Sequence, residues 1–194
     1  MDCDFAGATL TVELGTHILT GYFQIDILNV INPPSTTPSS SFEFESRDDE
    51  GNLLDFKRED IALTATSEAL TSVVLESVDQ TVAAVTELEV SVILNNPLLA
   101  GGYIQMGHPD SPYLGVSMIG EDYTVTAMAG LDDDLTSTYA DNVLTVNDAV
   151  PNQIDGGTTI SFRVSDFLNP ISTAELTGFW LATFDAEGGT IDDS

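Results

Sequence analysis

Basic side chains are almost absent from this sequence. Lysine and arginine together number 4 of 194 residues, against 32 aspartates and glutamates, so the formal net charge is −28. Nucleic-acid binding needs basic patches that neutralise phosphate, and an anionic lipid surface repels an acidic chain. Both functions are therefore excluded. The four basic residues are Arg47, Lys57, Arg58 and Arg163.

Cysteine is scarce as well, and this stretch contains neither a long apolar run nor the features of a leader. Cys3 is the single cysteine, so no internal disulfide can form, and the residue is either a free thiol or a link between two chains. No apolar run reaches the roughly 18 residues of a membrane-spanning helix. The start, Met1-Asp2-Cys3-Asp4, lacks the basic and apolar regions of a signal peptide, so either the chain is not secreted or its leader lies outside this stretch.

Apolar residues, in contrast, are plentiful at 42%, which separates the chain from acidic disordered proteins and provides material for a core. The length fits one large domain or two of about 100 residues. An acidic surface with so little lysine suits either a high-salt environment, where charge repulsion is screened, or an extracellular coat or fibre. Serine and threonine total 38, which favours the extracellular alternative.

Polar and apolar residues alternate with a period of two along most of the chain, which predicts strands with one buried face. Clusters rich in Gly, Asn, Asp and Pro separate these segments and predict turns. Two windows of helical length, 67–74 and 82–87, are too short and too rich in β-branched residues for helices. We predict an all-β antiparallel sandwich. The expected strands are 9–14, 22–27, 42–45, 88–93, 123–128 and 160–164.

An internal repeat with an offset of 137 residues is the strongest signal. Residues 32–55 and 169–192 share 9 identities in 24 gapless positions, and the identities fall on turn landmarks and one phenylalanine. With a three-residue gap, 10–12 also align with 144–146. Proline fixes φ, asparagine caps a turn, and glycine supplies positive φ, so the landmarks predict a duplicated strand–turn–strand geometry. The main landmarks are Asn32, Pro33 and Gly51 in the first copy and Asn169, Pro170 and Gly188 in the second.

The repeat predicts an unequal division of the chain. Residues 56–194 form one complete sandwich unit, whereas residues 1–55 match only the C-terminal part of a unit. A partial sandwich exposes strand edges and an apolar face. We expect it to be completed by an upstream repeat, by strands from a neighbouring chain, or by recruitment of residues 56–80. The first two outcomes both produce a linear polymer.

The Asn-Pro-x-Ser-Thr and Asp-x-Glu-Gly landmarks resemble those of tandem Ig-like repeats in large extracellular and surface proteins of protists and some prokaryotes. Residues 85–92, which lead into 96–105, are similar to a further element of such repeats, a strand followed by an Asn-Pro-Leu turn, a Gly-Gly turn and a second strand. The two patterns cover about half of the chain. The resemblance implies Ig-like antiparallel β-sandwich units in tandem, in a surface or fibre-forming structural protein, and it implies no catalytic residues.

No catalytic motif is present, and we expect no enzymatic activity. His17 and His108 both lie in predicted turns, and no nucleophile elbow, phosphate-binding loop or zinc-protease motif accompanies them. Acidic clusters at 48–50, 132–134, 185–187 and 192–193 all fall in predicted loops, but the alternating ligand spacing of a calcium loop is absent. We predict no cofactor and at most weak calcium binding. Trp180 is expected in the core or between sheets.

A Ser/Thr/Pro block at residues 33–41 has the composition of O-glycosylated segments, although a plain polar turn explains it equally well. The candidate O-glycosylation sites are Ser35, Thr36, Thr37, Ser39, Ser40 and Ser41.

The sequence as a whole favours a structural subunit, or a repeat segment, of an extracellular filament or surface appendage. Its partner would be the chain itself, as a homopolymer, with O-glycans on its surface. Two alternatives stay open: a calcium- or carbohydrate-binding adhesion module, and an acidic cell-envelope protein of a halophile.

Overall fold

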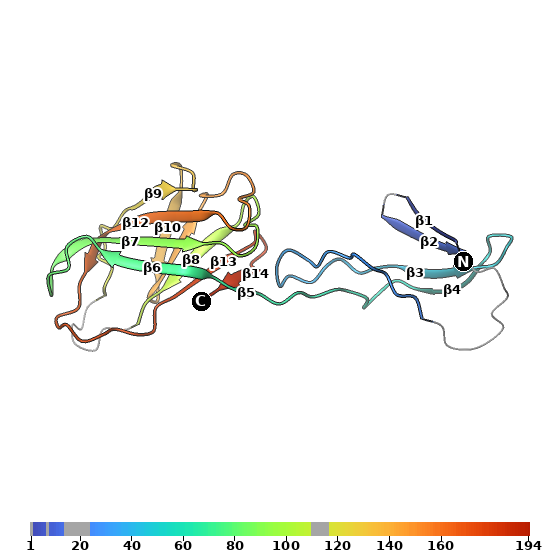
Figure 1. Cartoon of the computed structure of the whole chain (residues 1–194), viewed down its shortest axis with the longest axis horizontal. Coiled ribbons are helices and arrows are strands. Elements are labelled where there is room, and N and C mark those ends of the chain that lie inside the picture. The colour runs from blue at the N-terminus through green and yellow to red at the C-terminus, as the bar shows by residue number, and fades with distance from the viewer. Residues whose placement is uncertain (1, 7, 14–23, 110–116) are drawn as a thin grey trace. The chain divides into compact units, whose positions relative to one another are not determined.

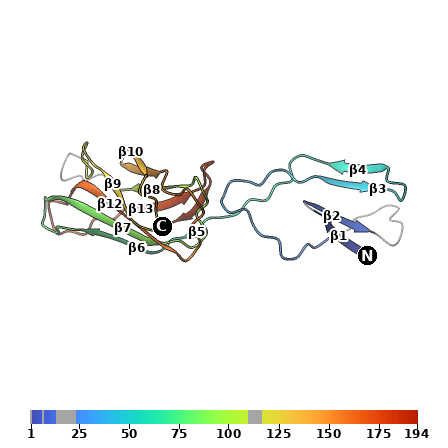
Figure 2. The same cartoon turned by 90° about the horizontal axis from the view of Figure 1, so that it is seen from above.

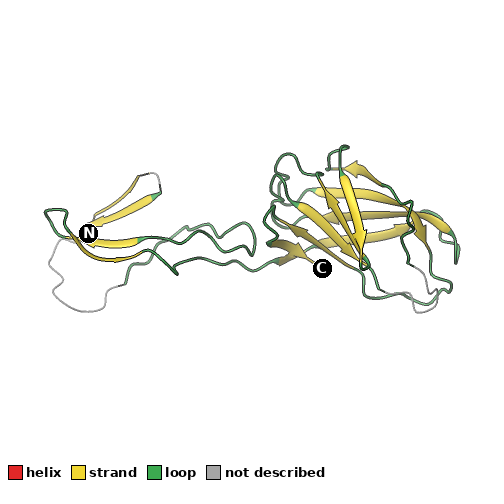
Figure 3. Ribbon diagram, turned by 180° about the vertical axis from the view of Figure 1, so that it is seen from behind, coloured by secondary structure: helices red, strands yellow, loops and turns green. Residues whose placement is uncertain are grey.

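The computed structural model describes residues 2–6, 8–13, 24–109 and 117–194. Within these ranges the chain forms strands and loops and no helix (Figure 3), which confirms the prediction of an all-β fold. No described segment is a helix long and apolar enough to cross a membrane. The strands are β1 (Asp2–Ala6), β2 (Thr9–Glu13), β3 (Phe44–Arg47), β4 (Leu53–Lys57), β5 (Glu68–Ala69), β6 (Thr71–Ser77), β7 (Val85–Ile93), β8 (Tyr103–Gly107), β9 (Val125–Ala129), β10 (Thr136–Ala140), β11 (Val143–Asn147), β12 (Thr159–Leu168), β13 (Trp180–Phe184) and β14 (Thr190–Asp193).

The chain divides into two compact units, Met1–Ile31 and Asn32–Ser194. The first unit contains the β1–β2 hairpin. The second contains all the other strands. The boundary predicted between residues 55 and 56 lies inside β4. Residues 32–55 belong to the second unit.

Two sheets form a sandwich in the second unit (Figures 1 and 2). One sheet has the strand order β6-β7-β12-β9, and the other has the order β10-β11-β8-β13-β14-β5. All pairings but one are antiparallel, as predicted. The exception is β14 with β5, where Asp192 and Asp193 lie opposite Glu68 and Ala69 in parallel. The short β5 therefore closes the edge of the larger sheet next to the C-terminus.

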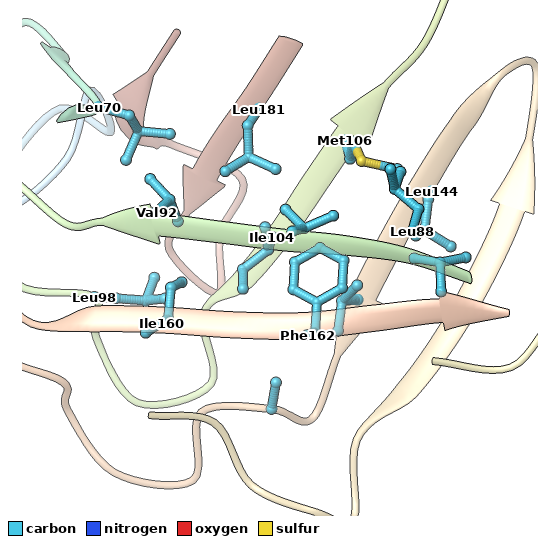
Figure 4. Close-up of a cluster of buried hydrophobic side chains, with 14 of the residues drawn as sticks. Leu70, Leu88, Val92, Leu98, Ile104, Met106, Leu144, Ile160, Phe162 and Leu181 are labelled. Atoms are coloured by element: carbon cyan, nitrogen blue, oxygen red, sulfur yellow. The ribbon is translucent and has the colours of Figure 1, made fainter. Parts of the chain in front are cut away.

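The core lies between these sheets, and alternation along the strands builds it (Figure 4). On β7 every second side chain points inward, and the central strand β12 repeats this pattern. Strands β8 and β11 supply the facing side chains from the other sheet. Removing apolar surface from water stabilises a fold by about 25 cal/mol per Å², so this period-2 pattern holds the layers together. The central core residues are Leu88, Val90, Val92, Ile104, Met106, Leu144, Val146, Ile160, Phe162, Val164 and Leu181.

A long antiparallel excursion from the sandwich ends in the β3–β4 hairpin. Backbone hydrogen bonds join its two legs, from Ser39 N to Leu63 O (2.9 Å) and from Phe42 N to Ile61 O (2.7 Å). The strands β3 and β4 form a two-stranded sheet of their own. The strand predicted at 42–45 is therefore realised slightly later, as β3.

One predicted strand is wrong in its described part. Residues 24–27 of the segment 22–27 form no strand. The repeat aligns this segment with β12, which lies hydrogen-bonded between β7 and β9. Within the described residues no strand pairs with residues 24–27, and a strand without a neighbour leaves its backbone groups unpaired. Neither of the windows of helical length is a helix, as expected. Residues 67–74 cover β5 and the start of β6, and residues 82–87 cover a turn and the start of β7.

Candidate functional site

The turn between β13 and β14 is organised around one carboxylate. Asp185 Oδ1 accepts hydrogen bonds from the backbone N–H groups of Glu187 (2.9 Å) and Gly189 (2.8 Å). Asp185 N donates to Gly189 O (2.9 Å), and Gly188 N donates to Asp185 O (3.2 Å). Gly188 has a φ of +89°, which explains why glycine occupies this landmark. The Asp-x-Glu-Gly sequence thus builds a closed loop with local bonds only.

The second carboxylate oxygen of this turn binds a segment 150 residues away. The hydroxyls of Ser35 and Thr37 both donate to Asp185 Oδ2, the latter at 2.9 Å. Between them, Thr36 N donates to Thr190 O (2.8 Å), and Thr190 N donates to Thr36 Oγ1 (2.9 Å). We call residues 35–37 the docking segment. It joins the first copy of the repeat to the second through hydrogen bonds that the Ser-Thr landmark makes possible.

The hydrogen bonds determine the charge state of this turn. Burial by itself would raise the pKa of Asp185, but hydrogen bonds from Ser35, Gly189, Thr37 and Glu187 outweigh burial, and the pKa lies below its ordinary value. The carboxylate is therefore ionised at neutral pH, and the bonds to it are charge-assisted.

Gly189 makes room for the docking segment. A Cβ atom at this position would lie 2.0 Å from Thr37 Oγ1 and 2.7 Å from Thr37 N, where no real side chain fits. The docking therefore requires glycine at position 189 because the backbone of the segment passes directly over it.

The first copy of the repeat contains the same turn. Asp48 Oδ1 accepts from Glu50 N (3.0 Å) and Asn52 N (2.7 Å), Gly51 has a φ of +84°, and Asp48 N donates to Asn52 O. The registers of the flanking strands also match. Ser46 pairs with Asp55 as Thr183 pairs with Asp192, and both hairpins shift register at the next position.

The two copies differ where the docking segment binds. Asn52 occupies the position of Gly189, and its Nδ2 donates to Asp48 Oδ2 at 2.9 Å. This side-chain bond is the main cause that lowers the pKa of Asp48. Asn52 thus donates to the second carboxylate oxygen from within the turn. In the second copy, the hydroxyls of Ser35 and Thr37 donate to that oxygen from outside the turn. The first turn is closed by its own side chain.

Positions that are buried in the second copy are exposed in the first. Ile191 is 2% exposed and its counterpart Leu54 is 62% exposed, while Leu181 is 1% exposed and its counterpart Phe44 is 49% exposed. The landmark Asn169 is buried and its counterpart Asn32 is exposed. Hairpin geometry is thus duplicated, but the burial of its side chains is not.

Asp192 shows what completes the hairpin in the second copy. This residue is fully buried, and its Oδ2 accepts from the backbone N–H groups of Asn95 and Asn96, both at 3.0 Å. Asn96 Nδ2 donates to Oδ1 at 2.8 Å. The prediction that residues 192–193 lie in a loop was wrong, because both belong to β14. The counterpart of Asp192, Asp55, lies on the exposed strand β4.

Asn169 holds a second long-range contact of the complete unit. Its Nδ2 donates to Asp79 O and to Thr81 O, the latter at 2.8 Å, and its Oδ1 accepts from Ser77 Oγ at 2.7 Å. The adjacent landmark Pro170 accepts at its carbonyl from Ala83 N (3.0 Å). In the first copy, Asn32 and Pro33 lie at the start of the excursion, where Asn32 is exposed and Pro33 is half-buried like Pro170.

The N-terminal hairpin follows the repeat as well. Strands β1 and β2 pair Asp2 with Glu13, and β10 and β11 pair Thr136 with Asn147, so that the two hairpins match at an offset of 134 residues throughout. This offset is the one found in the sequence after a three-residue gap.

The candidate glycosylation sites have different surroundings. The side chains of Ser35, Thr36 and Thr37 are committed to the docking contact, and Ser35 is buried. Ser39 and Ser41 accept hydrogen bonds from Leu63 N and Ile61 N on the opposite leg. Ser40 is exposed. A glycan at Ser35 would disrupt the docking contact, whereas one at Ser40 would not.

The remaining candidates form no common site. His17 lies outside the described residues. His108 is buried and stacks on Tyr139, with 5.7 Å between the ring centroids. Its Nε2 is hydrogen-bonded to the Tyr139 hydroxyl (2.6 Å) and its Nδ1 to Pro109 O (3.0 Å). Trp180 lies across Gly107 at the start of β13 and is 37% exposed, so it is not a core residue. Within the described ranges no group of three or more His, Cys, Asp or Glu residues is placed to hold a metal ion, at 132–134 or elsewhere.

Comparison with known proteins leaves the family open. No protein-family model matches the chain, and no curated protein matches it. Among solved structures, the chain is similar to a family GH18 chitinase from Chromobacterium violaceum, with 12% sequence identity and a TM-score of 0.34. The match covers 66% of this chain and 19% of the chitinase chain. A likeness at this level supports no argument about activity.

Proposed function

We propose that this protein is a structural subunit or repeat segment of an extracellular filament or surface appendage, in which Ig-like β-sandwich units follow one another end to end. One observation carries the proposal. The β3–β4 hairpin has the turn and register of β13–β14 but exposes the positions that the second copy buries. We infer that further strands, from an upstream repeat or from a neighbouring chain, cover the exposed positions of this hairpin.

The docking segment supports an end-to-end arrangement. Residues 35–37 belong to the first copy, yet they bind the turn of the second copy through the Asp185 carboxylate and Thr190. Each junction between units of this repeat therefore carries a hydrogen-bonded contact besides the connecting chain. Such contacts restrain the angle between successive units, which a fibre requires and a freely jointed string of domains lacks.

The acidic surface places a condition on assembly. Chains of net charge −28 repel one another, and exposed charges are screened over about 8 Å at physiological ionic strength. Cations, glycans or apolar interfaces must offset the repulsion. We expect divalent cations to act on the surface as a whole, so assembly weakens on chelation and at very low ionic strength.

The test is electron microscopy of the native material together with sedimentation velocity of the purified chain, over a range of salt and calcium concentrations. The proposal expects linear assemblies whose lengths depend on cations. Dispersed monomers under all conditions would contradict it. Sequence flanking the 194 residues in the gene distinguishes the two forms of the polymer, because further copies of the 137-residue repeat mean a covalent array.

A further inference from the structure

One sheet of the sandwich has four strands without charge in a strongly acidic chain. Strands β8, β10, β11 and β13 contain no Asp, Glu, Lys or Arg, although charged residues make up 19% of the sequence. The other sheet carries charged residues on three of its four strands, among them Glu76, Glu89 and Arg163. The two outer faces of the sandwich therefore differ in kind, and only one of them shares the acidity of the whole chain.

The residues on the uncharged outer face follow from the strand register. Met106, Leu144 and Leu181 point into the core (Figure 4), and adjacent residues of a strand point to opposite faces. Their neighbours along β8, β11 and β13 therefore point outward. Across β13 and β8 the outward pairs are Trp180 with Gly107, Ala182 with Gln105, and Phe184 with Tyr103.

Trp180 lies against the sheet on this face and is 37% exposed. A Cβ atom at position 107 would lie 1.9 Å from the indole Nε1 and 2.1 Å from Cε2, so the ring occupies the space next to the Gly107 backbone. Glycine at position 107 is what lets the ring lie there. A large side chain that is already held in place loses little conformational entropy when a ligand binds to it.

Neutral hydrogen-bonding groups lie beside this ring. The Gln105 amide Nε2 donates to Thr145 Oγ1 (3.2 Å), which fixes the amide on the face. The Tyr103 ring stacks on Phe184, with 4.9 Å between the centroids. Among the described residues, none accepts a hydrogen bond from the Trp180 indole N–H or bonds the Tyr103 hydroxyl. These groups are available to hydroxyl groups of a ligand.

We propose that this face binds an uncharged, extended polysaccharide, with one sugar ring stacked on the Trp180 indole and the chain running along β13 and β8 toward Tyr103. A sugar ring presents C–H groups on its faces and hydroxyls at its rim, which matches an aromatic ring flanked by neutral donors and acceptors. Trp180 and Phe184 are four residues apart on one strand, or about 13 Å, so the ligand spans several sugar rings. The face lies within one sandwich unit, and this binding goes beyond the proposed function and does not depend on assembly.

Charge at the border of the face selects among ligands. Asp148 is exposed beside β10, where its Oδ2 accepts from Thr136 Oγ1 (2.6 Å). Asp193 is exposed on β14, opposite Ala182 of β13. An anionic polymer or a second copy of this acidic chain would bring its own negative charge against these carboxylates and be repelled. A neutral polysaccharide meets no such repulsion.

The test uses the intrinsic fluorescence of the full chain, because Trp180 is its single tryptophan. The probes are two neutral β-1,4-linked hexasaccharides, cellohexaose and mannohexaose, at concentrations up to the millimolar range. We expect at least one of them to change the fluorescence saturably, and ¹⁵N NMR to place the shifted amides on β8 and β13. Hexagalacturonic acid, a negatively charged hexasaccharide, should not bind.

Variants assign the binding to the face. Trp180→Ala, followed by NMR, should weaken binding at least about tenfold, which corresponds to 1.4 kcal/mol. Gly107→Ala keeps the tryptophan but places a Cβ atom in the space of its ring, so it should weaken binding as well. The matched control is Thr126→Ala, at an exposed position of β9 on the other sheet, which should bind like the wild type. Urea unfolding of each variant separates lost binding from a lost fold.

Several results would overturn the inference: no saturable binding of either neutral hexasaccharide, equal binding by folded Trp180→Ala, or equal binding of hexagalacturonic acid. Self-association of the chain that Trp180→Ala abolishes would assign the face to a second copy and overturn it too. Filament formation is a separate readout. Binding by a chain that never assembles supports the polysaccharide face and contradicts the filament, whereas filaments that bind neither neutral probe do the reverse.

Discussion

Replacing Gly189 with asparagine gives the second turn the residue that Asn52 supplies in the first, and it should release the docking segment. The new Cβ would lie 2.0 Å from Thr37 Oγ1 and 2.8 Å from Asp185 Oδ2. Gly189 does not have a positive φ, so the backbone itself tolerates a side chain. The expected effect therefore comes from the lost docking contact and not from strain within the turn.

Its magnitude follows from the bonds that are lost. Four hydrogen bonds hold residues 35–37, two of them to the Asp185 carboxylate. At about 1 kcal/mol for each neutral bond and about 2 for each charged one, they contribute about 6 kcal/mol. Releasing three residues recovers about 1 kcal/mol each in backbone entropy, and a bond from the new asparagine to Asp185 recovers about 1 more. The net loss is about 2 kcal/mol, or a roughly 30-fold rise in the open population.

Native-state amide hydrogen exchange measures this opening directly. The amides of Thr36 and Thr190 should lose protection by roughly 30-fold in the Gly189→Asn variant, whereas core amides of β7 should change little. The matched control is Asn52→Gly, which removes the cap of the first turn and should leave both amides as they are. Unchanged protection of Thr36 in Gly189→Asn would refute the assignment of the docking contact.

Four further outcomes are expected. The folded-state pKa of Asp185 is depressed, so its contribution to stability is complete above the ordinary aspartate pKa of about 3.9. That contribution is lost as the pH falls through the folded-state pKa. Thermal melts between pH 7 and pH 2 should show this loss in the wild type and not in Asp185→Asn. Asp192→Ala removes a buried carboxylate and leaves the part-buried backbone N–H groups of Asn95 and Asn96 without their acceptor, which should cost about 3 kcal/mol in urea unfolding. A loss below 1 kcal/mol would contradict this role. Asn169→Ala should cost about 2–3 kcal/mol and raise exchange in the loop at 78–84, and an unaffected loop would count against the role of Asn169. Raising the salt concentration from 0.05 to about 0.5 M should raise the melting temperature, because screening relieves the repulsion of a −28 chain; a melting temperature independent of salt would show that repulsion is unimportant.

Much of the second unit could be predicted from alternation alone. The expected strands at 88–93, 123–128 and 160–164 lie on β7, β9 and β12, because period-2 burial is a local property that the residue order imposes. The same reasoning failed at 24–27, where the pattern is present but no described strand pairs with the segment. A strand forms only when its backbone groups pair with a neighbouring strand, so an alternating sequence is necessary but not sufficient.

The candidate site was predicted in part. The repeat identified the Asp-x-Glu-Gly turn, and positive φ at Gly51 and Gly188 shows why glycine recurs. Sequence reasoning assigned Ser35 and Thr37 to glycosylation and missed that they bind Asp185. The available signal was that Ser-Thr and Asp recur together at one offset, which is typical of residues that act as a pair.

The sequence by itself determined the acidity, the strand period and the two Asp turns, because each depends on residues within a few positions of one another. Tertiary structure alone decided that Asp185 binds a segment 150 residues away and that Asp192 is buried under the Asn95–Asn96 turn. It also decided that Asn52 bonds the Asp48 carboxylate within the first turn, whereas Gly189 leaves space for the docking segment at the second. The physical reason is distance along the chain. Local hydrogen bonds form wherever their residues are close in sequence, whereas these contacts exist only after the sandwich has brought its strands together.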